Sequence, residues 1–285
     1  PFIWTTLHDF GGTDGMKGNL SQINEIPYAA MAPEEKTSVW GTGFTPEGID
    51  QNPVYYEFMI EQNFRAQRVA DIPQNCAERA MKRYVLQSPT SAAATAAKAS
   101  WTLLCESAYT DDIDVQDHSG GPHLPASYTE FAADRRTPNE KLCKEFKAWE
   151  QLISAGLNGG KDLLGMEPFS YDLVNLGQEI LTQLSSPMSM NFSDALAAGK
   201  LDGDLLKRTG NLYVDVLEDI DQLVGTDSGF LLGSWLEMAR YWASPAGGPV
   251  ATDCAAQNFP IIGSDCKKFY EWNARVQLTT WNPTA

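Results

Sequence analysis

Two short apolar runs near the start of the chain have the pattern of buried strands. They are PFIWTTL, residues 1–7, and TSVWGTGF, residues 37–44. A glycine-rich loop, HDFGGTDG, follows the first run. Residues 20–32, between the runs, are predicted to form a short helix or an irregular link.

A helix is predicted directly after the second run. Asn52 can cap its start, and Pro53 suits its first position. One buried face is expected to carry Tyr56, Met59, Ile60 and Phe64. The order strand, crossover, strand, helix is typical of a parallel α/β sheet or barrel.

From Asp71 onward, strand signals nearly vanish and apolar residues return at helical spacing. FSYDLVNLGQEILTQL and DLLKRTGNLYVDVLEDIDQLV are clear examples, and NEKLCKEFKAWEQLISAG is predicted to end as a helix at Gly156. Such apolar stripes are typical of a helical bundle. The predicted fold class is therefore α/β plus all-α, with residues 1–70 at the end of a sheet or barrel and residues 71–285 in an all-α domain.

The composition narrows the classes of partner. The chain has 285 residues, 43% of them hydrophobic, and its 21 basic and 37 acidic residues give a net charge of −16. An acidic surface repels nucleic acid and anionic lipid, so neither is an expected partner. No apolar run approaches the ~18 residues of a membrane-spanning helix.

Cysteine and sequon positions bear on the compartment. There is no CxxC pair and no Cys/His cluster with zinc spacing, so no metal site is predicted. Cys254 and Cys266 flank a loop-like segment that a disulfide can staple, and the odd count of five leaves at least one thiol over. Sequons at Asn19 and Asn191, with the acidic balance, favour a lysosomal or extracellular protein.

Glu47 is the candidate catalytic residue. It follows the second strand in a Pro-Glu-Gly turn and precedes a helix. In a (β/α)₈ barrel this is the rim where catalytic groups collect. Pro46 restricts the backbone before Glu47, and Gly48 permits a tight bend after it, so the position of the carboxylate would be fixed. The alternative is an acidic turn residue that faces water.

His8 and Asp9 follow the first strand in the same way. His8 can donate a hydrogen bond to a sugar hydroxyl, and Asp9 can accept one. Alternatively, His8 is half-buried and bonded to a neighbouring carbonyl. GTGFTPEG lacks the spacing of a dinucleotide fingerprint, and no P-loop, GxSxG or HExxH motif occurs, so no cofactor is predicted.

Four stretches resemble glycoside hydrolase family 89, the α-N-acetylglucosaminidases. They are PFIWTTLHDFGG, GTGFTPEGIDQNPVYYEFM, GFLLGSWLEMAR and KFYEWNARVQLTTWNP, and they occur in the family's order. The resemblance implies the last part of a (β/α)₈ barrel followed by much of an all-α domain. It also implies removal of terminal α-linked N-acetylglucosamine, as from heparan sulfate, with retention.

The same resemblance assigns roles to residues. It makes Glu47 the nucleophile and places the acid/base glutamate in an earlier barrel segment with no counterpart in this chain. A second chain or a preceding segment is then expected to complete the barrel, and the chain alone is expected to be inactive. Where the family commonly has Asn, this chain has Asp9, which changes a donor amide to an acceptor.

The last matching block adds a pocket wall. Trp281 is predicted to stack on a sugar, and Arg275 to be a structural or pocket-wall charge, with packing at a domain interface as the alternative for both. A second class of function stays open, which is a non-catalytic glycan-binding or structural subunit of a larger extracellular assembly. The intact Pro-Glu-Gly favours the enzyme.

Overall fold

The computed structural model describes residues 1–7, 16–32, 38–45, 53–86, 88, 90–110, 140–197, 203–243 and 265–279.

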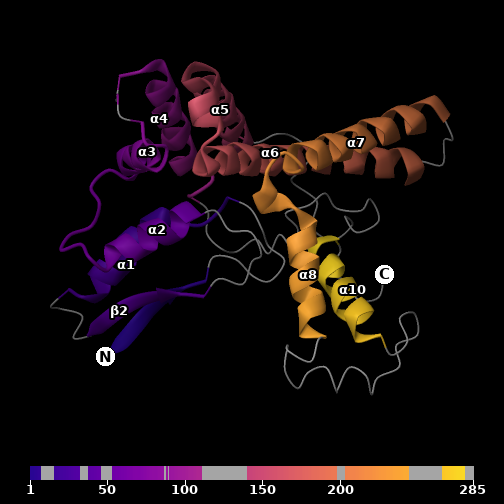
Figure 1. The fold of residues 1–285 in the computed structure, drawn as a ribbon. Coiled ribbons are helices and arrows are strands. Elements are labelled where there is room, and N and C mark those ends of the chain that lie inside the picture. Colours follow the sequence, from indigo (N-terminus) through magenta and orange to yellow (C-terminus); the bar gives the residue numbers. More distant parts are fainter. Residues whose placement is uncertain are drawn as a thin grey trace.

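The first part of the chain is a β-α-β-α unit (Figure 1). Strands β1 (Phe2–Thr6) and β2 (Val39–Phe44) pair in parallel, and helix α1 (Leu20–Ala30) is the crossover between them. Helix α2 (Pro53–Gln62) follows β2. This confirms the predicted parallel α/β arrangement, and α2 begins at the proline that the sequence indicated.

Two asparagine side chains hold the crossover helix in place, one at its start and one near its middle. Asn19 caps α1 by accepting a hydrogen bond from the Gln22 amide, which satisfies a backbone donor at the helix start. Further along, buried Asn24 forms two 2.8 Å hydrogen bonds with the backbone of Val69. The segment that follows α2 is thereby held against α1.

The buried face of α2 differs from the predicted one. Met59 is buried as expected, but Ile60 is 47% exposed and Phe64, beyond the helix, is 84% exposed. The buried residues are Val54, Tyr55, Phe58, Met59 and Gln62. Gln62 makes this face hard to recognise in the sequence, because a polar residue is not expected at a buried position. Its buried amide is tolerated because it donates to the Phe58 carbonyl and accepts from the Tyr28 hydroxyl.

The remaining elements are helices. Figure 1 shows α3, α4 and α5 as a bundle, α6 and α7 as a long hairpin, and α8 and α10 as a separate pair. Their bounds are α3 Ile72–Arg83, α4 Ala92–Cys105, α5 Glu140–Leu164, α6 Glu167–Ala197, α7 Gly203–Val224, the 3-10 turn η3 Ser228–Phe230, α8 Leu232–Trp242 and α10 Cys266–Thr279. Among the described residues, no helix has the length and apolar composition needed to cross a bilayer.

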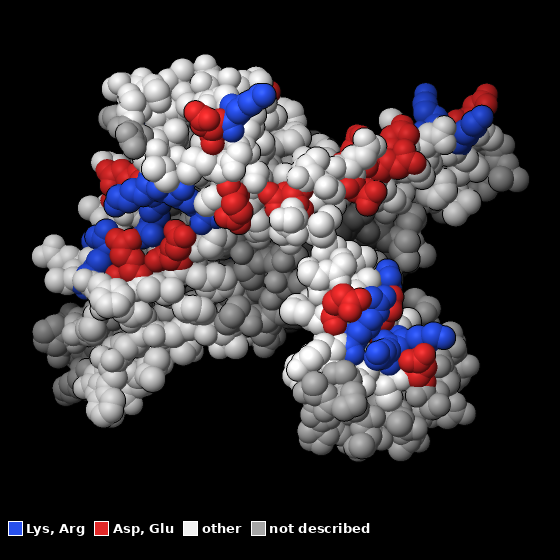
Figure 2. Space-filling view, in the orientation of Figure 1, with Lys and Arg blue, Asp and Glu red and all other residues white. Residues whose placement is uncertain are grey.

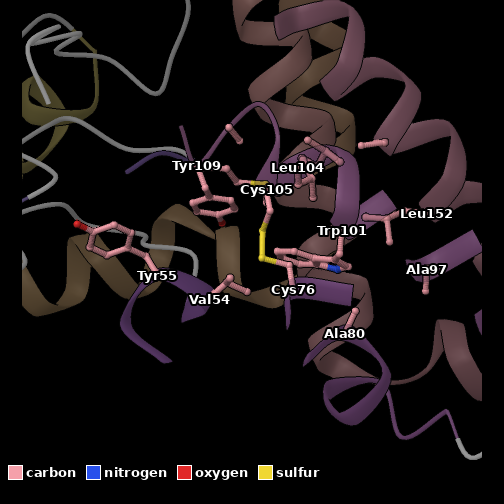
Figure 3. Close-up of a cluster of buried hydrophobic side chains, with 14 of the residues drawn as sticks. Val54, Tyr55, Cys76, Ala80, Ala97, Trp101, Leu104, Cys105, Tyr109 and Leu152 are labelled. Carbon is pink, nitrogen blue, oxygen red and sulfur yellow. A yellow bond between two sulfur atoms is a disulfide. The ribbon is translucent and has the colours of Figure 1, made fainter. Parts of the chain in front are cut away.

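One hydrophobic core continues from the β-α-β-α unit into the bundle. The alanines of α4 let it pack closely against α3 and α5, and Trp101 is the largest side chain buried there. Figure 3 shows Trp101 beside a disulfide that joins Cys76 of α3 to Cys105 of α4. The sequence left the partners of both cysteines open.

We expect loss of this disulfide to destabilise the chain strongly. The two cysteines are 29 residues apart. Closing a loop of that size lowers the conformational entropy of the unfolded chain, which stabilises the folded state by roughly 3–4 kcal/mol. Replacing Cys76 and Cys105 together by alanine should lower the free energy of unfolding in urea by about this amount. Cys143→Ala, at an exposed thiol on α5, is the control and should change it little. Equal midpoints for both variants would contradict the prediction.

Candidate functional site

The carboxyl ends of β1 and β2 lie side by side. Thr6 is in register with Phe44, and the Thr45 amide donates a 3.1 Å hydrogen bond to the Thr6 carbonyl. Because the strands are parallel, the chain leaves both of them at the same edge of the sheet. The segments with His8 and Asp9, and with Glu47, therefore start from adjacent points.

His8, Asp9, Glu47 and Trp281 all lie outside the described residues. Their roles stay predictions, and the described residues give the frame that surrounds them.

Tyr55 ties this edge of the sheet to α2. Its hydroxyl lies 2.8 Å from Thr6 Oγ1, and its buried ring lies against Gly18. Gly18 has φ +126°, and a Cβ there would lie 2.3 Å from the Tyr55 ring, so only glycine fits. The end of β1, the approach to α1 and the first turn of α2 thus meet at one side chain.

Tyr55 did not stand out in the sequence. Its position was the available signal, because Tyr55 lies in the first turn of the helix that follows β2 and Thr6 ends the neighbouring strand. A buried tyrosine usually finds a hydrogen-bond partner, and Thr6 is the polar residue at that end.

A second group of polar residues lies where α2 meets the helical domain. Asp172 of α6 is completely buried and accepts hydrogen bonds from Tyr84 at 2.7 Å and from Arg83 at 3.0 and 3.2 Å. Trp101 donates to the Tyr84 hydroxyl at 2.7 Å. Arg83 also contacts Glu57 of α2 at 3.1 Å. Arg83 therefore joins two parts of the chain.

Burial and charge act together on this group. Burial lowers the pKa of Arg83, but the charges of Asp172 and Glu57 outweigh it and the pKa lies above its ordinary value. Burial, and then the negative charge of Asp172, raises the pKa of Tyr84 well above its ordinary value. Tyr84 stays a neutral donor and Arg83 a cation across the physiological range.

The α8–α10 pair lies on the side of the molecule toward which the strands point (Figure 1). Trp235 of α8 donates a 3.2 Å hydrogen bond to the Ala274 carbonyl of α10. Glu271 accepts from Arg275 and Arg240, and these hydrogen bonds hold the pKa of Glu271 below its ordinary value. Arg275 contacts a residue one turn away on its own helix, and both of its predicted roles stay predictions.

Glycosylation at Asn19 and Asn191 and a disulfide between Cys254 and Cys266 stay predictions. The Asn19 side chain is half-buried, and its Nδ2 donates a 3.2 Å hydrogen bond to the Thr110 carbonyl. Asn191 is exposed on α6. Cys266 begins α10, and Cys254 lies outside the described residues. Within the described ranges, no three His, Cys, Asp or Glu side chains gather closely enough to hold a metal ion.

Two family models match the chain in succession. Residues 1–66 match the tim-barrel domain of α-N-acetylglucosaminidase (NAGLU), and residues 77–285 match the C-terminal domain of the same family. The human protein named α-N-acetylglucosaminidase is 32% identical over 286 aligned residues, which is 99% of this chain. The fold class is therefore part of a (β/α)₈ barrel followed by a helical domain.

Solved structures share the fold. A family 89 glycoside hydrolase from Clostridium perfringens, in complex with PUGNAc, superposes with a TM-score of 0.69 at 20% identity. A variant of the Clostridium perfringens enzyme with two glutamates replaced by glutamine, in complex with its substrate GlcNAc-alpha-1,4-galactose, gives a TM-score of 0.68 at 20% identity. Each comparison covers 99% of this chain.

The chain spans only part of each relative. It covers 34% of the length of the human protein and 29% of each Clostridium perfringens chain.

Proposed function

Because this chain belongs to the α-N-acetylglucosaminidase family, glycoside hydrolase family 89, we propose that it is part of a retaining exo-glycosidase. The substrate is a glycan with terminal α-linked N-acetylglucosamine, such as heparan sulfate. Residues 1–70 form the last part of the catalytic barrel, and residues 71–285 form the helical domain that packs on it.

The main observation in support of this proposal is that the ends of the two strands are adjacent. The hydrogen bond from Thr45 to Thr6 brings the starts of two polar segments together. One segment holds Glu47 and the other holds His8 and Asp9. A glycosidase needs a carboxylate at the anomeric carbon and polar groups on the hydroxyls of the same sugar, and neighbouring strand ends of a barrel supply both.

Glu47 acts as the nucleophile. Its carboxylate attacks the anomeric carbon and forms a covalent glycosyl-enzyme, while a second carboxyl group protonates the leaving oxygen. That second group then removes a proton from water, and the hydroxide displaces Glu47 with a second inversion. The two steps together retain the configuration.

The acid/base glutamate comes from outside these 285 residues. A retaining enzyme holds its two carboxyl groups about 5–5.5 Å apart, so the partner acid belongs to another strand of the same barrel. The Clostridium perfringens variant that holds its substrate has two glutamates replaced by glutamine, which supports a mechanism with two such groups.

Exposed apolar side chains on the sheet support a completed barrel. Ile3 of β1 is 62% exposed and Trp40 of β2 is 79% exposed. A two-stranded sheet is marginally stable alone, and exposed apolar groups on it favour further barrel elements as cover. We propose that a second chain or a further segment supplies them.

The pocket is closed from the helical domain. Trp281 follows α10, and α8 and α10 lie on the side that the strand ends face (Figure 1). In this proposal Trp281 stacks on the sugar, and His8 and Asp9 bind its hydroxyls. The protein is lysosomal or extracellular and carries glycans at Asn19 and Asn191, and the disulfide between Cys76 and Cys105 fits an oxidising compartment.

Turnover by the chain alone and by the completed barrel tests the proposal. The 285-residue chain should hydrolyse an alkyl α-N-acetylglucosaminide at least ~10²–10⁴-fold more slowly than the completed barrel, since general acid catalysis is worth that factor and the acid is absent. The chain joined to the remaining barrel segments should hydrolyse it, with the α-anomer as the first product in a proton NMR time course.

Three outcomes would count against the proposal. Hydrolysis by the lone chain at the full rate would refute the external acid, and the β-anomer as first product would refute retention. Glycan binding by the completed protein without any turnover would favour the non-catalytic subunit.

A further inference from the structure

Helices α2 and α3 flank a groove of about 420 Å³. Figure 2 shows that basic and acidic side chains gather on this side of the molecule. Every side chain that lines the groove is charged or carries an amide. Pockets that bind small molecules have volumes of ~300–1,000 Å³, but their walls are mostly apolar. The size of this groove therefore suits a small molecule, and its lining suits a hydrated and charged one.

The end of the groove beside Arg83 is already neutralised. Arg83 contacts Glu57 of α2 at 3.1 Å and the buried carboxylate of Asp172 at 3.0 Å. Two carboxylates meet one guanidinium at this end, so a further anion would be repelled from it. Any anion that enters the groove is therefore directed to the opposite end.

The opposite end of the groove has cations in excess. Arg65 and Arg79 share the single carboxylate of Glu61. Lys82 also lines the groove, is exposed, and forms no ion pair with any residue that the structure describes. Glu78 is the other carboxylate at this end. Three cations thus stand against two carboxylates here, in a chain whose net charge is −16.

Hydrogen-bond donors lie together on one face of α3 at this end. Asn75, Arg79 and Lys82 are separated by four and three residues, so they are neighbours on the helix surface. Arg79 is only 13% exposed, and its Nε donates a 2.8 Å hydrogen bond to Asn75 Oδ1. Its guanidinium also lies 5.4 Å from the centre of the Phe58 ring. A guanidinium has five N–H donors, so this fixed group keeps donors beyond those that Asn75 and Glu61 use.

We propose that this end of the groove binds the sulfate or carboxylate group of an acidic saccharide, with Arg79 and Lys82 holding the anion. Guanidinium and ammonium groups form strong, charge-assisted hydrogen bonds with such oxygens. The choice of a saccharide rests on the proposed function, and the volume of the groove leaves room for a sugar ring beside the anion. Because the chain as a whole is acidic, a positive groove is where an anionic glycan is attracted rather than repelled.

Three charge variants of the completed enzyme test the site, with a sulfated heparin disaccharide as the probe in calorimetric titrations at low salt. Lys82→Gln should weaken binding about tenfold, because one charge-assisted hydrogen bond is lost. Glu78→Gln should strengthen binding several-fold, because it removes a carboxylate that repels the anion. Lys207→Gln is the matched control and should bind like the parent, since Lys207 is exposed near the start of α7, at the end of the α6–α7 hairpin that points away from α3 (Figure 1). All three side chains are exposed, so the fold should be unchanged.

The titration does not depend on turnover. If the completed enzyme fails to hydrolyse its glycoside, the proposed function fails, and the titration still decides whether the groove binds the probe. Equal losses of affinity in Lys82→Gln and Lys207→Gln would mean a diffuse effect of surface charge and would overturn the site. Equal affinity for the desulfated and carboxyl-reduced disaccharide would overturn the role of the anion. Inorganic sulfate that binds as tightly as the disaccharide would overturn the assignment of a saccharide.

Discussion

Replacing Glu47 by glutamine in the completed enzyme is expected to lower kcat by roughly 10⁴-fold or more. An amide of the same shape has no charge with which to attack the anomeric carbon, so the covalent intermediate cannot form. Losses of this order follow removal of a nucleophile from other enzymes. The measurement is turnover of an aryl α-N-acetylglucosaminide, with inhibitor binding to confirm that the pocket is intact.

Azide rescue identifies the role of Glu47 more sharply than loss of rate. In Glu47→Ala, azide can enter the space of the carboxylate and attack the α-glycoside from the opposite face. The expected product is a β-glycosyl azide, whereas loss of the acid/base group would give the α-azide through the surviving glycosyl-enzyme. Glu25→Gln, at an exposed carboxylate on α1, is the control and should leave the rate unchanged. More than a tenth of the parent activity in Glu47→Gln would contradict the assignment.

The parallel arrangement could be predicted because its signals are local. The apolar runs ending near Leu7 and Phe44 are short, and the proline at the start of α2 marks a helix boundary by its fixed backbone angle. Consecutive strands usually lie next to each other, and a helix between them supplies the crossover that parallel pairing needs. The adjacency of Thr6 and Thr45 follows from that rule.

Glycine misled the prediction of a helix end. The sequence indicated that the helix carrying Leu152 would stop at Gly156, but α5 continues to Leu164. Gly156 lies at a close approach, because a Cβ there would lie 2.8 Å from Leu164 Cδ2 and 3.3 Å from the Phe169 ring, and those side chains would have to shift. The real change of direction is at Gly160, whose φ of 62° is in the left-handed region.

Pairings between distant residues could not be predicted from one sequence. Cys76 had four possible partners, and the geometry that selects Cys105 exists only after α3 and α4 pack together. Nothing in the sequence around Asp172 indicates that it is buried, since a single acid within a helical pattern is typical of a solvated face. It meets Arg83 over a separation of 89 residues.

For the candidate site, the sequence predicted the two strands that surround it. Parallel strands place the segments of His8, Asp9 and Glu47 at one edge, and the structure confirms that edge through Thr6 and Thr45. The orientation of the four predicted side chains depends on tertiary contacts, which a local sequence pattern does not contain.

Asp172→Asn is expected to lower the free energy of unfolding by about 3–5 kcal/mol. The carboxylate is completely buried and accepts from Arg83 and Tyr84, so a neutral amide leaves a largely buried guanidinium facing a group without charge. Asp219→Asn makes the same chemical change at an exposed position of α7 and should alter the free energy of unfolding by less than about 0.5 kcal/mol.

A double-mutant cycle with Arg83→Met distinguishes a buried ion pair from simple loss of packing. Once the cation is gone, loss of the Asp172 charge no longer leaves an uncompensated partner. The double variant should therefore be more stable than the sum of the single losses predicts, by about 0.5–3 kcal/mol. Strict additivity in urea unfolding would mean that Arg83 and Asp172 act independently. Coupling would mean that Arg83 and Asp172 stabilise the helical domain together, as one buried ion pair.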